Sequence, residues 1–199
     1  MHLDTVTKYP FLHSGELYAS NMPELFMEQR QCLKAMDEFN RTAITDLEGR
    51  EALLPQMFDK VGKGCFVEAP ILMNFGGNHV RLGDNVYINY GFIAVDDTFI
   101  TIGDNTMIGP RVTIATAVHP EDIELRSKAY QYNKPVTIGK NVWIAANVTI
   151  LPGVTIGNGS IIGAGSVVTK DIPENVVAIG TPCKVIRPIR PEDKSNIKY

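Results

Sequence analysis

His119 is the strongest candidate for chemistry in this chain of 199 residues, because it stands where a regular repeat is interrupted. It directly precedes Pro120, and a residue before proline is restricted to extended conformations. The imidazole is therefore expected to project from a rigid strand end. A neutral imidazole with an ordinary pKa of about 6.5 can accept a hydroxyl proton near pH 7. This placement indicates a positioned general base.

The segment from 115 to 135 carries further polar and aromatic side chains. Glu124 and Arg126 lie in its middle, and its return carries Tyr130, Gln131 and Tyr132. Long loops in compact domains usually serve a function or are disordered. A lone histidine is more often structural than catalytic, and it is this loop that favours catalysis for His119.

The sequence around the loop repeats every six residues. One aliphatic set is Ile138, Ile144, Ile150, Ile156, Ile162 and Val168, and two positions before each member stand Val136, Val142, Val148, Val154, Ser160 and Ser166. Each hexapeptide predicts one short strand and one turn, so three form a triangular coil of about 18 residues, which is typical of a parallel β-helix. The aliphatic residue is expected to point into the prism. The glycine that follows it, as at Gly103 and Gly139, is expected to let the backbone turn the corner.

The same phase runs upstream through Leu82, Ile88, Ala94, Ile102, Ile108 and Ile114, with two residues inserted around "VDDT". Between Ile114 and Ile138 the repeat would place Pro120, Arg126 and Tyr132 inside the prism, where none of them belongs. The sequence therefore predicts a loop that leaves the coil and returns in phase.

Residues 1–61 hold nearly all the helical signal. Apolar spacing predicts a helix from Pro23 to Asn40. A second helix is expected to open at Thr45, with Glu48 completing a capping box, and to end at Gly62. Its predicted apolar face is Leu47, Leu54, Met57, Phe58 and Val61. With so few core positions, this helical pair is expected to fold against something larger.

The composition excludes several classes of protein. Hydrophobic residues make up 44% and charged residues 21% of the chain, as in ordinary soluble domains, and the net charge of −3 argues against nucleic-acid binding. No apolar stretch approaches the roughly 18 residues of a membrane span, and the N-terminus does not read as a signal peptide. Cys32, Cys65 and Cys183 share no metal-ligand spacing. We therefore expect a cytoplasmic protein with reduced, buried cysteines.

Several stretches resemble the maltose and galactoside O-acetyltransferases of the hexapeptide-repeat superfamily. They are "GELYAS", "NVYINYGFIAVDD", "ATAVHP", "VTIGKNVWIAANVTILPGVTIGNGSIIGAGSVVTKDIP" and "AIGTPCKVIR", and the resemblance covers about residues 8–190. It implies a mainly β fold, a left-handed parallel β-helix with an N-terminal helical segment. The implied parts are the helical segment 1–61, an acyltransferase domain 62–190 with an extruded loop 115–135, and a tail 191–199.

The resemblance also implies an activity. The donor would be acetyl-CoA and the acceptor a sugar hydroxyl, typically the 6-OH of a maltose, glucose or galactoside type of sugar. The enzyme would be a homotrimer with active sites between neighbouring prisms, and it would need no metal. A thioester is already activated, so no covalent intermediate on Cys65 or Cys183 is expected.

Residue by residue, the family's catalytic base falls on His119. The acceptor site falls on Asn74, Asn89, Asp97 and Gln131, with Ser20 or Asn21 from the N-terminal segment. The CoA site falls on Asn89, Ala146, Ala164, Thr169, Lys170, Lys184 and Arg187. Relatives often carry serine where this chain has Ala146, so oxyanion stabilisation there would require a backbone N–H. Asn74 and Gln131 stand where relatives vary, which leaves the identity of the sugar open.

Other functions fit the sequence less well. γ-Class carbonic anhydrases share the prism but need three histidines around zinc, whereas His2, His13 and His79 are scattered. An ice-binding prism would show an unbroken threonine ladder, and serine acetyltransferases carry a larger helical domain. Antibiotic acetyltransferases of this superfamily also use a loop histidine. Acetylation of another small acceptor, such as an antibiotic or an amino sugar, is therefore the open alternative.

Overall fold

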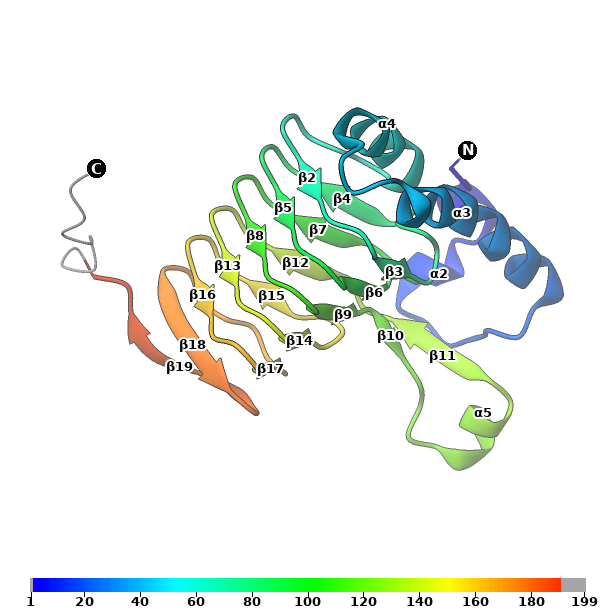
Figure 1. Cartoon of the computed structure of the whole chain (residues 1–199). Coiled ribbons are helices and arrows are strands. Elements are labelled where there is room, and N and C mark those ends of the chain that lie inside the picture. The colour runs from blue at the N-terminus through cyan, green and yellow to red at the C-terminus, as the bar shows by residue number, and fades with distance from the viewer. Residues whose placement is uncertain (1, 191–199) are drawn as a thin grey trace.

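A computed structural model describes residues 2–190, and the predicted tail 191–199 lies outside the described residues. The chain winds into a three-sided prism of short parallel strands, which confirms the predicted left-handed β-helix (Figure 1). The β2 face contains β2 (Phe66–Val67), β5 (Tyr87–Ile88), β8 (Met107–Ile108), β13 (Trp143–Ile144), β16 (Ile161–Ile162) and β18 (Val176–Gly180), with antiparallel β19 (Cys183–Pro188) at its edge. The β3 face contains β3 (Leu72–Met73), β6 (Ile93–Val95), β9 (Thr113–Ala115), β14 (Thr149–Ile150) and β17 (Val167–Val168). The β4 face contains β4 (Val80–Leu82), β7 (Ile100–Ile102), β12 (Val136–Ile138) and β15 (Thr155–Ile156).

The aliphatic residues of the hexapeptides stack in the prism as predicted. Ile102, Ile138 and Ile156 are in register on the β4 face, and equivalent columns run inside the other two faces. All of these side chains are buried. Ser160 and Ser166, the polar members of the second set, are also buried, and their hydroxyls donate to the carbonyl oxygens of Pro173 and Gly163. The prism interior is therefore apolar with its few polar groups satisfied.

The expected role of the corner glycines is wrong. Gly103 and Gly139 do not have the positive φ of a left-handed turn; that conformation occurs two residues later, at Asn105 and Asn141, with φ of 57° and 54°. Asparagine tolerates this region better than most side chains. A Cβ on Gly103 would instead lie 2.7 Å from the backbone of Gly139 in the next coil. The glycines are needed because adjacent coils approach closely.

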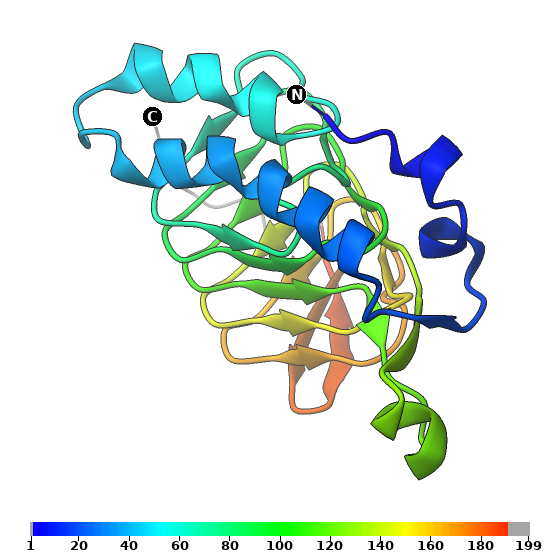
Figure 2. The ribbon, with the colours of Figure 1, turned by 90° about the vertical axis from the view of Figure 1, so that its right-hand side faces the viewer.

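Two helices close one end of the prism, as Figures 1 and 2 show. α3 (Pro23–Arg41) matches its prediction. Its buried Met36 and Phe39 join a core with α4 (Leu47–Met57) and the first coils, whereas Leu25 packs with the N-terminal segment. α4 differs at both ends. Its N-cap is Asp46 rather than Thr45, because the Asp46 carboxylate already accepts from the backbone N–H of Gly49 at 2.9 Å. The helix ends at Met57, so Val61 packs against the core from outside the helix.

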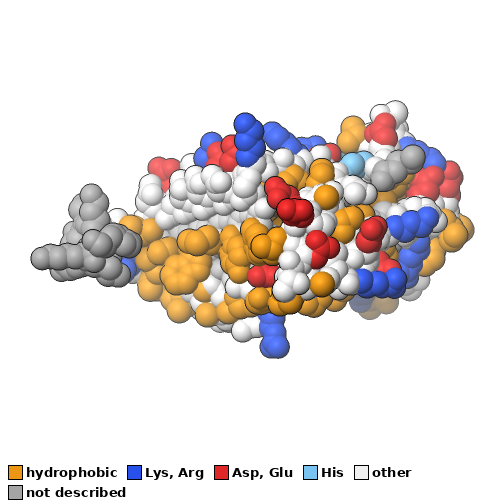
Figure 3. Space-filling model, turned by 45° about the horizontal axis from the view of Figure 1, so that its top comes forward, with side chains coloured by type: hydrophobic (Ala, Val, Ile, Leu, Met, Phe, Trp, Pro, Cys, Tyr) orange, Lys and Arg blue, Asp and Glu red, His pale blue; other side chains and the backbone are white. Residues whose placement is uncertain are grey.

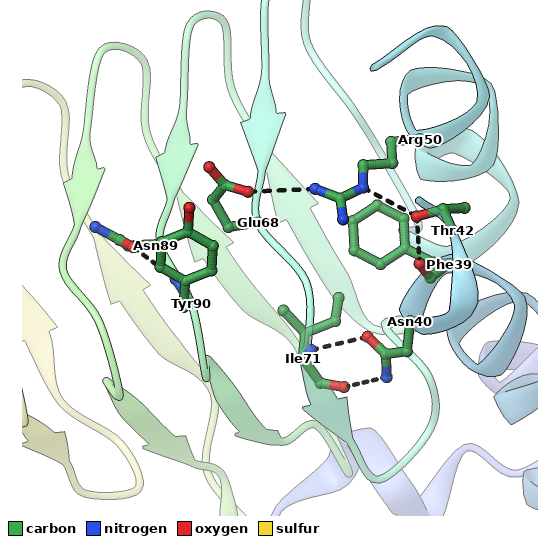
Figure 4. Close-up of polar contacts among 8 residues, drawn as sticks. All are labelled: Phe39, Asn40, Thr42, Arg50, Glu68, Ile71, Asn89 and Tyr90. Atoms are coloured by element: carbon green, nitrogen blue, oxygen red, sulfur yellow. Dashed lines mark hydrogen bonds and ion pairs between the residues drawn. The ribbon is translucent and has the colours of Figure 1, made fainter. Parts of the chain in front are cut away.

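Polar contacts join this helical cap to the first coil (Figure 4). The guanidinium of Arg50, with only 6% of the residue exposed, donates from Nη1 to Glu68 at 3.2 Å and from Nε to Thr42 Oγ1 at 2.9 Å. The Asn40 amide bonds both backbone groups of Ile71, donating at 2.7 Å and accepting at 2.9 Å. Removing either partner of the buried ion pair would leave a buried charge unpaired, which is strongly destabilising. These contacts therefore hold the cap on the prism.

The N-terminal segment contains α1 (Thr5–Lys8) and α2 (Phe11–Ser14), which the sequence did not predict. It is held by a directional chain of hydrogen bonds. The Asp96 carbonyl can only accept, so His79 donates to it from Nδ1 at 2.5 Å and accepts from the Thr5 hydroxyl at Nε2, at 2.7 Å. The Thr5 oxygen then accepts from His13 Nε2 at 3.0 Å. This arrangement requires a neutral His79, and burial lowers the pKa of that imidazole to about 4.

The predicted loop is an antiparallel hairpin that projects from the side of the prism (Figure 1). It consists of β10 (Ala117–Val118), α5 (Ile123–Ser127) and β11 (Tyr130–Asn133). The two-residue strand β1 (Tyr18–Ala19) pairs with the outer side of β11, which makes a three-stranded sheet. The N-terminal segment and the loop are thus one structural unit. Within residues 2–190, no helix has the length and apolar character needed to cross a membrane.

Candidate active site

His119 lies at the start of the hairpin, one residue beyond β10, and its side chain is exposed. Its Nδ1 lies 3.1 Å from the carbonyl oxygen of Tyr130 on the opposite arm. A carbonyl oxygen only accepts, so Nδ1 must carry the hydrogen in this contact. In the neutral ring the lone pair is then on Nε2, and that atom can accept a proton.

The charged residues of the hairpin serve its own structure. Arg126 donates from Nη1 to the carbonyl oxygens of Pro120 and Glu121, both at 3.0 Å. Glu124 pairs with Lys128 at 2.7 Å. The polar residues in the middle of the loop thus hold its tip together, which keeps His119 and Pro120 in a defined turn.

A cavity of about 570 Å³ lies between α3, the β3 face and the hairpin. Four of the six predicted acceptor residues line it, namely Ser20, Asn74, Asp97 and Gln131. The cavity wall also includes apolar side chains such as Phe26, Leu72 and Ile93, as in many small-molecule sites. Segments far apart in the sequence therefore meet at one concave surface.

Asp97 is the polar centre of this cavity. Only 6% of the residue is exposed, and its two carboxylate oxygens accept from Asn74 Nδ2 at 2.7 Å and from Gln131 Nε2 at 2.8 Å. Ser20 donates instead to the carbonyl oxygen of Ala129, at 2.8 Å. A carboxylate held by two amides in a half-apolar cavity can accept hydrogen bonds from a hydroxylated ligand.

The structure places the other two predicted acceptor residues outside this cavity. Asn89 lies at a corner after β5, where its Oδ1 accepts from the backbone N–H of Tyr90 at 2.7 Å (Figure 4). Asn21 is exposed in the turn before α3. Neither lines the cavity of the single chain.

Apart from Asn89, the predicted CoA residues lie on the C-terminal coils and on β19, in two groups. Asn89 belongs to a corner column that runs from Glu68 through Asn89, Gly109 and Ala145 to Gly163. The backbone N–H of each member donates to the carbonyl oxygen just before the equivalent corner of the next coil. Ala146 and Ala164 stack in the next column, since Gly165 donates to the Ala146 carbonyl at 2.9 Å. Lys184 on β19 pairs with Ile179, whose side chain packs over Gly163. This first group therefore lines one edge of the prism.

The remaining CoA candidates are elsewhere. Thr169 and Lys170 follow β17 and are exposed at a different corner, where Leu151 donates to the Val168 carbonyl. Arg187 is in the edge strand β19, opposite Val177. The single chain does not bring all these residues into one cavity.

The sequence missed two polar residues, Tyr18, which lines the cavity, and Asn133, which lies behind it. The Tyr18 hydroxyl contacts the amides of both Gln131 and Asn133, and burial raises the pKa of Tyr18 to about 12. No periodic signal marks either residue. Their contact joins positions 115 residues apart and depends on the pairing of β1 with β11.

The cysteines are not suited to nucleophilic chemistry. Cys32, Cys65 and Cys183 are free, and only Cys183 is fully buried; the other two are half-buried. Burial raises the pKa of the Cys32 thiol to about 11 and raises the pKa of Cys65 and Cys183 as well. A thiol with a raised pKa is mostly protonated near pH 7 and is a poor nucleophile. In the described part of the chain, no three His, Cys, Asp or Glu side chains gather as metal ligands would.

Comparison with known proteins identifies the family. Residues 135–170 match the family described as bacterial transferase hexapeptide (six repeats), and residues 12–62 match the maltose acetyltransferase hexapeptide capping motif. Galactoside O-acetyltransferase of Lactococcus lactis subsp. lactis (strain IL1403) is 49% identical, over 93% of this chain and 89% of its own length.

Solved structures agree with the sequence relatives. A galactoside acetyltransferase in complex with coenzyme A superimposes with a TM-score of 0.90 at 44% identity, over 95% of this chain and 94% of that one. A maltose O-acetyltransferase from Clostridium difficile 630 gives a TM-score of 0.87 at 46% identity, over 90% and 95%. Because these likenesses span both the helical cap and the prism, the chain belongs to the galactoside and maltose O-acetyltransferase family, whose members are acetyl-CoA-dependent sugar O-acetyltransferases.

Proposed function

We propose that this enzyme transfers the acetyl group of acetyl-CoA to the 6-hydroxyl of a maltose, glucose or galactoside type of sugar, with His119 as the general base. The observation that carries the proposal is the cavity at which Ser20, Asn74, Asp97 and Gln131 converge. A sugar presents several hydroxyls, and fixed carboxylate and carboxamide groups are suited to orient them.

The hairpin connects this cavity to the proposed base. Val118 pairs with Tyr132 in the β10–β11 ladder, and continuing that register by one residue sets His119 opposite Gln131. Gln131 lines the cavity, so the proposed base and the cavity wall are on the two arms of one hairpin. A base must lie within hydrogen-bond reach of the proton that it removes, directly or through one water.

The reaction then needs no covalent enzyme intermediate. The sugar oxygen attacks the thioester carbonyl carbon while its proton passes to Nε2 of His119. Collapse of the tetrahedral intermediate breaks the C–S bond, and the thiolate of CoA takes up the proton from the imidazolium. The Nδ1–H contact to the Tyr130 carbonyl supports this role because it keeps the lone pair on Nε2.

We also propose that the active enzyme is a homotrimer, with each site completed between neighbouring prisms. Outward-facing side chains on the β2 face form a continuous apolar ladder, Phe66–Tyr87–Met107–Trp143–Ile161–Val177. Met107 and Trp143 are 51% and 48% exposed, and Figure 3 shows hydrophobic side chains gathered in a band along the prism. Large exposed apolar surfaces generally mark an interface. The equivalent ladder on the β4 face is polar, with Arg81, Thr101, Thr137 and Thr155.

A neighbouring copy would also explain how the two groups of CoA candidates could form one site. Ala146 and Ala164 line one corner, whereas Thr169 and Lys170 lie at another, so a cleft between two prisms could be bordered by both. We place the enzyme in the cytoplasm, where its three free cysteines would remain reduced.

An acceptor screen tests the activity. The purified chain is incubated with acetyl-CoA and a panel of maltose, glucose, methyl galactoside, amino sugars and an antibiotic substrate, while release of the CoA thiol is followed. We expect turnover with the neutral sugars and, by NMR of the product, acetylation of the primary hydroxyl. Turnover with only the amino sugars or the antibiotic would instead assign the enzyme to the alternative acceptor class.

A further inference from the structure

A buried phenol in the acceptor cavity has an unused hydrogen. Tyr18 is 7% exposed and lines the cavity beside Asp97 and Gln131. Its oxygen is contacted by Gln131 Nε2 and by Asn133 Nδ2, the latter at 3.0 Å. Which of these groups donates decides where the phenol hydrogen points.

Both amide orientations are fixed by groups that can only accept. Gln131 Nε2 also lies 2.8 Å from Asp97 Oδ2, and the opposite orientation would set the amide oxygen against a carboxylate. Asn133 Nδ2 lies 2.9 Å from the Leu12 carbonyl oxygen, so this amide cannot be reversed either. Two N–H groups therefore donate to the Tyr18 oxygen, and neither amide can receive its hydrogen.

The phenol keeps that hydrogen at neutral pH. Burial, and after it the charge of Asp97, raises the pKa of Tyr18 to about 12. Among the described residues, no group accepts a hydrogen bond from the Tyr18 hydroxyl. The side chain lines the cavity, where a ligand could accept this bond. The cavity wall thus offers a hydrogen-bond donor at Tyr18 and acceptors at Asp97.

We propose that Tyr18 is a specificity-determining residue that donates a hydrogen bond to a non-reacting oxygen of the acceptor. This inference rests on the proposed function, because it takes the cavity as the acceptor site. A hydroxyl, ring or glycosidic oxygen can accept from Tyr18, and a hydroxyl can at the same time donate to Asp97. An ammonium group has no lone pair, so it cannot accept this bond. Tyr18 therefore selects oxygen over a protonated amine at one position of the acceptor.

The test compares Tyr18→Phe with wild type, with Tyr9→Phe as the matched control. Tyr9 belongs to the same small apolar cluster, but its hydroxyl donates to Glu28 at 3.0 Å and it does not line the cavity. Each protein is assayed with the best neutral sugar of the panel, with its monodeoxy derivatives and with its monoamino derivatives. The KM for acetyl-CoA and the thermal unfolding midpoint are measured alongside.

We expect Tyr18→Phe to raise the KM for the parent sugar about 2- to 13-fold, as for loss of one neutral hydrogen bond, and to leave the KM for acetyl-CoA unchanged. At one ring position the deoxy sugar should be used equally well by both proteins, because the bond is already absent. The preference for the hydroxyl over the amine at that position should also fall. Tyr9→Phe should change none of these ratios.

A second substitution keeps the ring and both donated bonds. Incorporation of 3-fluorotyrosine at position 18 makes the O–H more acidic, so the sugar KM should fall where that of Tyr18→Phe rises. An unchanged sugar KM in both variants, or an equal loss on every deoxy derivative, would overturn the role of Tyr18. If wild type acetylates no sugar but uses another acceptor, the proposed function fails, and Tyr18 is then judged by the same ratios on that acceptor.

Discussion

His119 and Tyr130 face each other across the hairpin, with 3.1 Å between Nδ1 and the carbonyl oxygen. This contact fixes the tautomer of the proposed base, and the proline after it fixes the backbone direction. The orientation of the proposed base therefore depends on the pairing of the two arms of the hairpin.

Replacing His119 with alanine should lower kcat about 10²- to 10⁴-fold while acetyl-CoA still binds, because only proton transfer is lost. Steady-state kinetics at saturating sugar and calorimetric titration of acetyl-CoA measure the two effects. His2→Ala, at an exposed histidine that contacts the Pro55 carbonyl, serves as the control. Retention of more than a tenth of wild-type kcat by His119→Ala would exclude the role of general base.

Asp97→Asn should impair use of the sugar and leave the donor unaffected. The substitution removes a charge and places an NH₂ group against one of the amides of Asn74 and Gln131 that now donate to the carboxylate. Loss of a charge-assisted hydrogen bond corresponds to a change of about 10- to 150-fold in sugar kcat/KM. Varying each substrate separately checks this. A change confined to the KM for acetyl-CoA would contradict the assignment of the cavity.

Lys184→Ala should raise the KM for acetyl-CoA about 10-fold or less, with kcat and the sugar KM nearly unchanged. Lys184 is exposed, so the lost contact with a phosphate is screened by water and salt and falls at the low end for a charged hydrogen bond. Lys140→Ala removes another exposed lysine, paired with Asp104 at 2.8 Å, and is the control. The difference between the two variants should shrink as salt is added.

Trp143→Glu should dissociate the proposed trimer and abolish activity, because it places a charge in the centre of the apolar ladder on the β2 face. Thr137→Glu makes the same change on the polar β4 face and should leave both properties intact. Analytical ultracentrifugation of the two variants gives the answer. A fully active monomer in either case would contradict a site shared between subunits.

The stability of the N-terminal segment should depend on pH through His79. Burial lowers the pKa of His79 from 6.5 to about 4, so the unfolded chain takes up the proton first as pH falls. Stabilisation by neutral His79 is thus complete above pH 6.5 and lost as pH approaches 4. The free energy of unfolding of His79→Gln should lie below that of wild type at pH 7, by a margin that narrows by on the order of 3 kcal/mol towards pH 4.

Burial also raises the pKa of Asp96 to about 7, which has the opposite effect on stability over this range. Because Asp96 is present in both proteins, its contribution cancels in the difference between them. Thr5→Val, which keeps the imidazole but removes its hydroxyl partner, should retain the pH slope of wild type. Denaturant unfolding at fixed protein concentration measures the stability of wild type, His79→Gln and Thr5→Val. A stability difference between wild type and His79→Gln that does not change with pH would refute the prediction.

The prism was predictable because its register repeats. Six-residue spacing identified the stacked columns and the hairpin that interrupts them, including the positions of Ile114 and Ile138 on either side. The two helices of the cap were predictable, but the residues at which α4 begins and ends were not. Asp46 and Thr45 are both good N-caps, and tertiary contacts rather than propensity decide between neighbours.

The polar wall of the cavity was predicted only in part. Asp97 and Gln131 came from family resemblance, whereas Tyr18 depends on the pairing of a two-residue strand with a hairpin more than a hundred residues away. Such a short strand has no period to detect. The expected turn at each glycine failed for a related reason, because the constraint on Gly103 comes from the next coil.

The stacked coils also set fixed distances along the prism axis. Three strand-to-strand steps, from β6 through β9 and β14 to β17, separate the coil beside Asp97 from the coil before Lys170. At about 4.8 Å per step the span is ~14 Å. Deleting or adding one whole coil would leave the other coils stacked in register. It would shift the proposed phosphate cations relative to the acceptor cavity by one step of about 4.8 Å. Under the proposed assignments, the number of coils therefore sets the distance between the phosphate-binding cations and the acceptor cavity.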